Sequence, residues 1–176
     1  VAATGADASF IAVPPKAASA AILEAAAAGI AFVVCITEGI PAQDEAKVFN
    51  TLLRDFPGTR LLGPNCLGIM RPGSQINLTF GHGFAHAGTI GLISQSGALC
   101  TAILDWALPN KVGFSNVVSL GAESDVDFGE MLDYMVSDPR TENIFLYIEG
   151  IKNARRFMSA LRAAASTARP WLRTSN

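Results

Sequence analysis

Charged residues are scarce in this sequence, and what is missing excludes several classes of protein. Asp, Glu, Lys and Arg make up 16% of the 176 residues, against roughly 25% in average soluble domains. Half of the residues are hydrophobic, so the chain can bury a core and does not have the composition of a disordered segment. At a formal net charge of −2 it lacks the basic face of a general nucleic-acid-binding protein. We expect a folded chain with no nucleic acid partner.

Long apolar runs are also missing. No stretch approaches the roughly 20 apolar residues that a membrane span needs, and the first ten residues lack the basic and apolar regions of a signal peptide. The three cysteines, Cys35, Cys66 and Cys100, lie far apart in apolar or glycine-rich contexts, as buried reduced thiols do. We expect no membrane partner, no metal site, and a cytoplasmic location, or the mitochondrial matrix in a eukaryote.

Short apolar runs alternate with helical patterns along the chain. The runs predict strands at residues 8–13, 30–37, 60–62, 89–93, 117–120 and 143–148, and a helical pattern follows five of these six. Strands that alternate with helices form parallel sheets covered on both faces. The sequence therefore predicts an α/β fold with parallel sheets, divided into two small domains.

Glycine and proline interrupt this alternation between Gly63 and Gly88, where little periodic signal remains. We interpret the interruption as the connection between two domains, residues 1–75 and 76–176. A dinucleotide-type half normally opens with a strand and a glycine-rich phosphate turn, and no such turn precedes the first strand. No strand is predicted after the last helix, because residues 169–176 are short and polar. We therefore expect both ends to be truncated.

Polar turns follow several predicted strands. Ligands bind at this edge of open parallel sheets, because loop amides and helix N-termini gather there. Thr37, Glu38 and Asn65 stand in two such turns, and an ordinary strand-ending turn is the alternative for each. Cys66 has no adjacent histidine or basic residue to lower its pKa, so a packed thiol is favoured over a nucleophile.

The segment Ser94-Gln95-Ser96-Gly97-Ala98 ends a predicted strand and begins a helix at once. The free amides of a first helical turn, the helix dipole and two hydroxyls together favour an anion. The segment therefore indicates a phosphate-binding turn, with a simple serine N-cap as the alternative.

Three further groups of side chains could carry chemistry. Glu149 closes a predicted strand, where a carboxylate can hydrogen-bond an imidazole and favour its protonated form; a solvent-facing glutamate is the alternative. His82 and His86 lie among glycines, which favours loop histidines over a zinc site. Asp125 and Asp127 precede a helix and are predicted to serve its N-terminus.

Motifs in these turns carry a resemblance to a known family. Residues 1–67, with ITEGIP and GPNC, resemble the CoA-binding domain of succinyl-CoA ligase α subunits. Residues 88–168, with SQSGAL and LYIEG, are more similar to single-chain ADP-forming acyl-CoA synthetases, which include fusions to protein lysine acetyltransferases. The chain is identified as a fragment from the NDP-forming acyl-CoA synthetase superfamily. The resemblance implies a Rossmann-like CoA-binding part followed by a flavodoxin-like ligase domain.

The resemblance also implies roles for the matched residues. The positions that would contact CoA are Ile36, Thr37, Glu38, Asn65 and Cys66. Those that would receive the phosphate of a phosphohistidine are Ser94, Ser96 and Gly97, and Glu149 would hydrogen-bond that histidine. In the family a β-type ATP-grasp subunit or domain, using ATP or GTP with Mg²⁺, phosphorylates the histidine. The phosphoryl group passes to a small carboxylic acid, and the CoA thiol attacks the resulting acyl phosphate.

The sequence departs from the family at two positions that matter. The family histidine lies downstream of Glu149, whereas no histidine follows His86 here. Thr101 stands where succinyl-CoA ligases carry a tyrosine near the substrate, which disfavours succinate. We therefore expect an acid–thiol ligase chain that is inactive alone. The alternatives are a non-catalytic CoA-binding or partner-docking module, part of a lysine acetyltransferase fusion, or an incomplete or recombined gene product.

Overall fold

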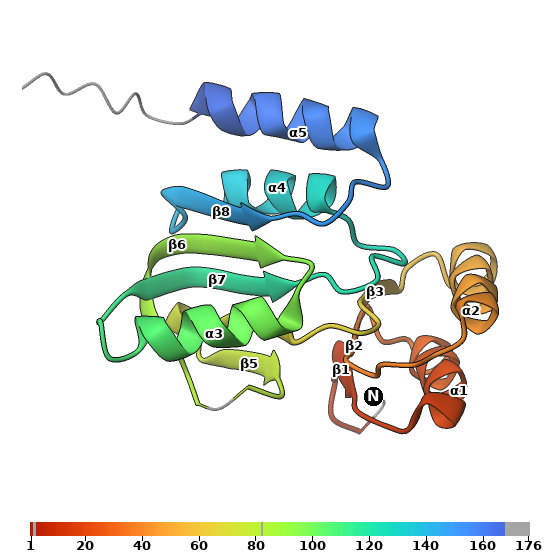
Figure 1. Ribbon diagram of the computed structural model, residues 1–176. Coiled ribbons are helices and arrows are strands. Elements are labelled where there is room, and N and C mark those ends of the chain that lie inside the picture. Colours follow the sequence, from red (N-terminus) through yellow and green to blue (C-terminus); the bar gives the residue numbers. More distant parts are fainter. Residues whose placement is uncertain (2, 82, 168–176) are drawn as a thin grey trace, which may run out of the picture.

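The computed structural model describes residues 1, 3–81 and 83–167 and contains two β-sheets flanked by helices (Figure 1). Sheet A consists of three parallel strands, β1 (Ala8–Ile11), β2 (Phe32–Cys35) and β3 (Arg60–Leu62). Sheet B has the order β5-β4-β7-β6-β8. Its strands are β4 (Gly68–Arg71), β5 (Ile76–Thr79), β6 (His86–Ser94), β7 (Gly113–Ser119) and β8 (Asn143–Tyr147). The predicted α/β class is confirmed.

Alternate side chains of β2 show how sheet A is buried on both faces. Val33 and Cys35 pack with helices α1 (Pro15–Ala27) and α2 (Ala42–Asp55), whereas Val34 packs into the core shared with sheet B. This alternation is typical of a strand covered on both sides. Gly29, with a φ of 85°, follows α1 and lets the chain turn back at once toward β2.

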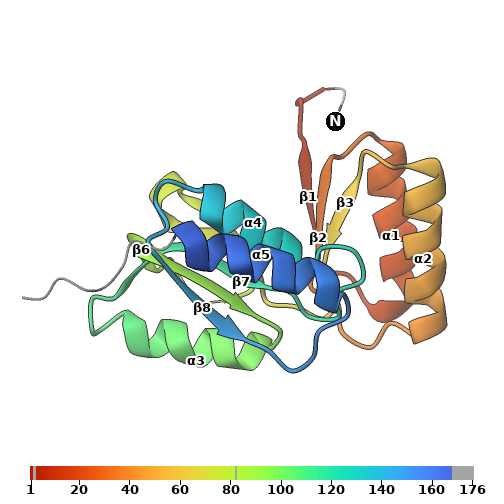
Figure 2. The ribbon, with the colours of Figure 1, turned by 90° about the horizontal axis from the view of Figure 1, so that it is seen from above.

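Helices also cover both faces of sheet B. Helix α3 (Gly97–Ala107) lies on one face, and α4 (Phe128–Ser137) and α5 (Ala154–Thr167) lie on the other (Figure 2). Leu92 and Val117 pack with α3, and the next residues along the strands, Ile93 and Val118, pack with α4. None of the described helices is long and apolar enough to cross a bilayer.

The expectation of entirely parallel sheets is wrong for sheet B. β6, β7 and β8 are parallel, but β4 pairs antiparallel with β7, and β5 pairs antiparallel with β4. The sequence pattern missed this hairpin because each strand has only four residues and carries no continuous apolar run. Because β4 begins at Gly68, sheet B starts before the predicted boundary at residues 75 and 76. The division into two domains remains a prediction. The expectation for residues 169–176 lies outside the described residues.

The loop after β7 covers the β3 edge of sheet A. The amides of Ser124 and Val126 donate to the carbonyls of Gly63 and Leu61, and the amide of Leu61 donates to the Asp125 carboxylate at 2.8 Å. This contact resembles the addition of a short strand beside β3. The two sheets are therefore joined through backbone hydrogen bonds as well as a shared apolar core.

One of the two aspartates predicted to serve the α4 N-terminus does so. Asp127 is the N-cap, and its side chain accepts a hydrogen bond from the Glu130 amide at 2.9 Å. The prediction is wrong for Asp125, which accepts hydrogen bonds from Nε and Nη2 of Arg60 at 3.0 and 2.9 Å. Its partner is distant in the sequence, so local spacing could not reveal the pair.

Candidate ligand site at the strand exits

The exits of sheet A and of β7 are linked by a series of hydrogen bonds. The Thr37 hydroxyl after β2 donates to the Val13 carbonyl after β1 at 2.8 Å. The Asn65 amide after β3 donates to the Thr37 carbonyl at 3.0 Å, and the Ala122 amide after β7 donates to the Pro64 carbonyl at 2.9 Å. The carboxyl ends of the two sheets therefore form one contiguous polar edge. Figure 1 shows β7 pointing toward sheet A.

The exits of β6 and β8 join the same edge. The Leu120 amide donates to the Ser94 carbonyl at 2.8 Å, which ties β7 to β6. The side chain of Gln95 accepts hydrogen bonds from the amides of Glu149 and Gly150 at 2.5 and 2.9 Å, and donates to the Gly150 carbonyl at 3.0 Å. Gln95 was not predicted as a site residue, although it lies inside the predicted phosphate turn.

Lys152 and Glu123 are two further residues of this edge that the sequence did not single out. The Lys152 ammonium donates to the carbonyls of Ala122 and Glu123 at 2.5 and 3.1 Å. Glu123 is 4% exposed, and its Oε1 has no hydrogen-bond partner within the described ranges. Burial raises the pKa of Glu123 to about 7; the charge of Lys152 lowers it, and Asp127 opposes that effect. No local motif signals this burial, because it results from packing between the sheets.

Two of the five residues predicted to contact CoA expose their side chains. Glu38 and Asn65 are exposed, and Asn65 adopts a left-handed φ of 54°, a conformation that Asn tolerates better than most residues. Ile36 is half-buried, and the Thr37 hydroxyl is occupied by its bond to Val13. Glu38 and Asn65 are therefore the side chains of this group best placed to meet a ligand.

Cys66 is a packed thiol. Its side chain is buried, and Sγ lies 3.4 Å from the Cys35 carbonyl oxygen. Burial raises the pKa of Cys66 to about 12, with a smaller contribution from the nearby Cys35 thiol. The thiol is therefore protonated at neutral pH and is not an activated nucleophile.

The serines of the predicted phosphate turn make local hydrogen bonds. Ser96 is the N-cap of α3, with its Oγ accepting from the Leu99 amide at 3.2 Å, so the N-cap alternative is confirmed. Ser94 is fully buried and donates to the Ser96 carbonyl at 2.9 Å. The amides of Gly97 and Ala98 open the helix and have no acceptor within it. An anion could still be bound by these two amides.

The remaining candidates lie apart from the edge or carry no ligand signal. His82 is outside the described residues, and the His86 ring contacts the Leu108 carbonyl at 3.2 Å. The Thr101 hydroxyl bonds within α3 to the Gly97 carbonyl at 3.1 Å. In the described part of the chain, no three His, Cys, Asp or Glu residues are grouped to hold a metal ion.

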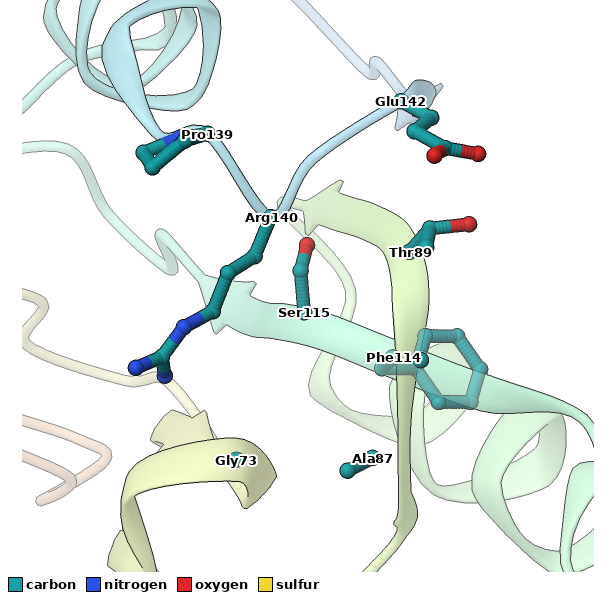
Figure 3. Close-up of a pocket in the computed structure, with 9 residues that line it drawn as sticks. Gly73, Ala87, Thr89, Phe114, Ser115, Pro139, Arg140 and Glu142 are labelled. Atoms are coloured by element: carbon teal, nitrogen blue, oxygen red, sulfur yellow. The ribbon is translucent and has the colours of Figure 1, made fainter.

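A pocket of about 350 Å³ lies at the opposite end of sheet B, where β6 and β7 begin (Figure 3). Phe114, Ser115, Thr89 and Arg140 line it, and the Arg140 guanidinium donates to the Ser74 hydroxyl at 2.9 Å. None of the predicted site residues lines this pocket. The candidate site is therefore the edge where the strands end, and this pocket lies apart from it, near the strand starts.

Two protein-family models match the chain, one over β1 and β2 of sheet A and one over the parallel strands of sheet B. The CoA binding domain matches residues 1–39, and the succinyl-CoA ligase like flavodoxin domain matches residues 87–171. The ADP-forming acetate–CoA ligase I of Archaeoglobus fulgidus is 36% identical over 163 residues, which cover 90% of this chain and 24% of that ligase. The chain belongs to the NDP-forming acyl-CoA synthetase superfamily. The resemblance inferred from the motifs is thereby confirmed.

Two further proteins of this kind have a similar sequence identity to the chain. The α subunit of ADP-forming succinate–CoA ligase from Aquifex aeolicus is 38% identical, covering 81% of this chain and 48% of the subunit. The dinucleotide-forming acetyl-coenzyme A synthetase 1 of Ca. Korarchaeum cryptofilum, solved with phosphate and ADP, has a TM-score of 0.83 at 32% identity. That comparison covers 89% of this chain and 35% of the synthetase. The chain thus spans less than half of the length of each of these relatives.

Proposed function

We propose that the chain is an α-type component of an NDP-forming acyl-CoA synthetase and binds CoA at the strand exits. One observation carries the proposal: the exits of both sheets are hydrogen-bonded into a single edge, with Thr37 and Asn65 on one side and Ser96 and Glu149 on the other. A thiol bound on the first side and a phosphoryl group bound on the second would share one reaction space.

The CoA half of this site would use the turns after β2 and β3. Asn65 can donate and accept hydrogen bonds. Its side chain is exposed, and its backbone amide donates to the carbonyl of Thr37, the residue before Glu38. Thr37 and Cys66 would support the turn from beneath, because their polar atoms bond to the Val13 and Cys35 carbonyls. Ile36 would supply apolar contact.

The phosphoryl half would use the N-terminus of α3 and the exit of β8. The free amides of Gly97 and Ala98 and the helix dipole favour an anion there. The Ser96 hydroxyl accepts from Leu99 and keeps its own proton for donation. The exposed Glu149 carboxylate would hydrogen-bond an imidazole. Such fixed donors stabilise charge on phosphoryl oxygens.

The rest of the reaction would depend on a partner. A β-type ATP-grasp subunit or domain would supply ATP or GTP with Mg²⁺, and a phosphohistidine would come from outside residues 1–176, since no histidine follows His86. The phosphoryl group would move to a small carboxylic acid, and the CoA thiol would displace phosphate to give the acyl-CoA. The proposed sum is acid, CoA and ATP to acyl-CoA, ADP and phosphate.

The first experiment is a calorimetric titration of CoA into the purified chain. Saturable binding is expected, with the Kd rising by roughly threefold to tenfold in Glu38→Ala and in Asn65→Gly. Glycine is chosen at residue 65 because it accepts the left-handed φ without strain. Asn50→Ala, on the exposed surface of α2 and away from its N-terminus, is the control. A folded wild-type chain that does not bind CoA would contradict the proposal.

A second candidate function is a CoA-binding or docking module without turnover, and the absence of a histidine after His86 favours it. With an ATP-grasp partner, ATP, Mg²⁺, CoA and acetate, we expect no acyl-CoA from the chain as given. Acyl-CoA formed without an added histidine-bearing segment would exclude the module and require a different phosphoryl carrier.

A further inference from the structure

Gln95 lies between the two serines of the phosphate turn, yet its side chain bonds to the segment that follows β8 and not to α3. Its backbone amide donates to the Tyr147 carbonyl at 3.2 Å, which extends the pairing of β6 with β8 by one residue. The side chain continues that pairing: Oε1 accepts from the amides of Glu149 and Gly150, and Nε2 donates to the Gly150 carbonyl. One side chain thus replaces strand pairing along the segment that carries Glu149.

This segment has few other restraints. β8 is the last strand in the order of sheet B, so within the described residues no strand pairs with its other side. The Glu149 side chain is exposed and forms no salt bridge in this part of the chain. Gln95 therefore restrains the backbone from which the Glu149 carboxylate projects.

We propose that Gln95 is a positioning residue that fixes Glu149 relative to the N-terminus of α3. This inference rests on the proposed function, in which Glu149 accepts a hydrogen bond from an imidazole whose phosphoryl group meets α3. Gln95 directly precedes the N-cap Ser96, so it connects the two halves of that site. The clamp keeps the backbone that carries Glu149 at a constant separation from the helix amides while the imidazole binds and leaves.

The clamp requires the chemistry of glutamine. It needs an acceptor for two amides and a donor for one carbonyl, and a primary amide supplies both. Glutamate at this position keeps the acceptor but loses the donor to Gly150, asparagine is one methylene too short, and methionine has the length with neither function. These three replacements therefore separate shape from hydrogen bonding.

The test uses the full chain with Gln95→Met, Gln95→Glu and Gln95→Asn, and Gln43→Met on exposed α2 as the control. Amide hydrogen exchange is measured by NMR. We expect exchange at Glu149 and Gly150 to become roughly tenfold faster in Gln95→Met and less so in Gln95→Glu. Asparagine should not restore protection. The exchange rate of core amides such as that of Val118 should be unchanged in these variants. All exchange rates should be unchanged in the control variant. Unaltered exchange at Glu149 and Gly150 in Gln95→Met would overturn the proposal.

A second measurement follows the Glu149 carboxyl carbon while imidazole is titrated in at about pH 6, where the ring is largely protonated. The wild type should shift saturably, and Gln95→Met should need severalfold more imidazole. Equal responses in both would overturn the positioning role. A wild type that ignores imidazole, with exchange still accelerated in Gln95→Met, would support the clamp and refute the histidine-binding role of Glu149 in the proposed function.

Discussion

Polar side chains are hydrogen-bonded differently at the two ends of sheet B. Toward the amino ends of β7 and β8, the buried Asp138 carboxylate accepts hydrogen bonds from Asn116 and Thr141 at 2.7 and 3.2 Å and pairs with Arg71 at 3.0 Å. At the carboxyl ends, the loops bond mainly through their backbones, and Glu149 is left exposed. The first arrangement satisfies its own charges and stabilises the fold, whereas the second leaves side chains available to a ligand.

The two ends also shift carboxyl groups in opposite directions. Burial alone would raise the pKa of Asp138, but hydrogen bonds from Asn116, the Arg140 amide and Thr141, with the charge of Arg71, outweigh it and lower that pKa. For Glu123 burial wins, and the pKa rises to about 7. Charge is thus stabilised at the amino end and penalised at the carboxyl end.

The largest expected effect is on stability at the amino end. Asp138→Ala should lower the free energy of unfolding by about 3 kcal/mol, because it leaves Arg71 and Asn116 without their buried partner. Urea unfolding measures the change, with the exposed Asp133→Ala on α4, the helix that ends just before Asp138, as the control. CoA affinity per folded molecule should stay within about twofold of wild type. A loss of CoA binding without a loss of stability would show that the amino end, and not the carboxyl end, serves the ligand.

The next effect is a pH dependence at the carboxyl end. Between pH 4.5, the ordinary pKa of the side chain, and about 7, native Glu123 holds a proton that the unfolded chain has released. Its contribution to stability is therefore greatest at low pH, falls as the pH rises through this window, and is lost above it. Glu123→Gln should remove this slope and gain about 2 kcal/mol over wild type at high pH, after allowance for partial solvent access.

Urea unfolding at pH 5 and pH 8 checks this prediction, and the exposed Glu24→Gln is the control for general charge effects. A difference between wild type and Glu123→Gln that stays constant with pH would show that Glu123 remains ionised throughout. A difference that grows as the pH falls would point to a depressed pKa, as at Asp138.

Sequence reasoning succeeded where the signal was local. The apolar runs located six strands, and the N-cap roles of Ser96 and Asp127 follow from their places directly before helices. It missed β4 and β5, because four-residue strands without an apolar run have no detectable period. β4 is held by pairing to β7 and β5 by pairing to β4, and only the folded chain brings these strands together.

The candidate site was harder to predict than the fold for the same reason. Glu149 could be suspected from its place at a strand end, but its link to Gln95 joins residues 54 apart in the sequence. Likewise, nothing near Glu123 in the sequence indicates burial, which results from the loop lying against Pro64 and its neighbours. Contacts between segments far apart in the sequence create these features, so a single sequence carries no pattern for them.

The smallest predicted effect separates structure from ligand binding at a single residue. Thr37 lies at the ligand edge, but its hydroxyl donates to the Val13 carbonyl at 2.8 Å. Thr37→Val preserves the shape and removes this donor, so the free energy of unfolding should fall by about 1 kcal/mol. Thr37→Ser keeps the hydroxyl and should lose less. Denaturation and CoA titration of both variants test the point. If Thr37→Val keeps its stability but loses CoA affinity, the hydroxyl serves the ligand, and the carboxyl end depends on side chains more than its backbone bonding indicates.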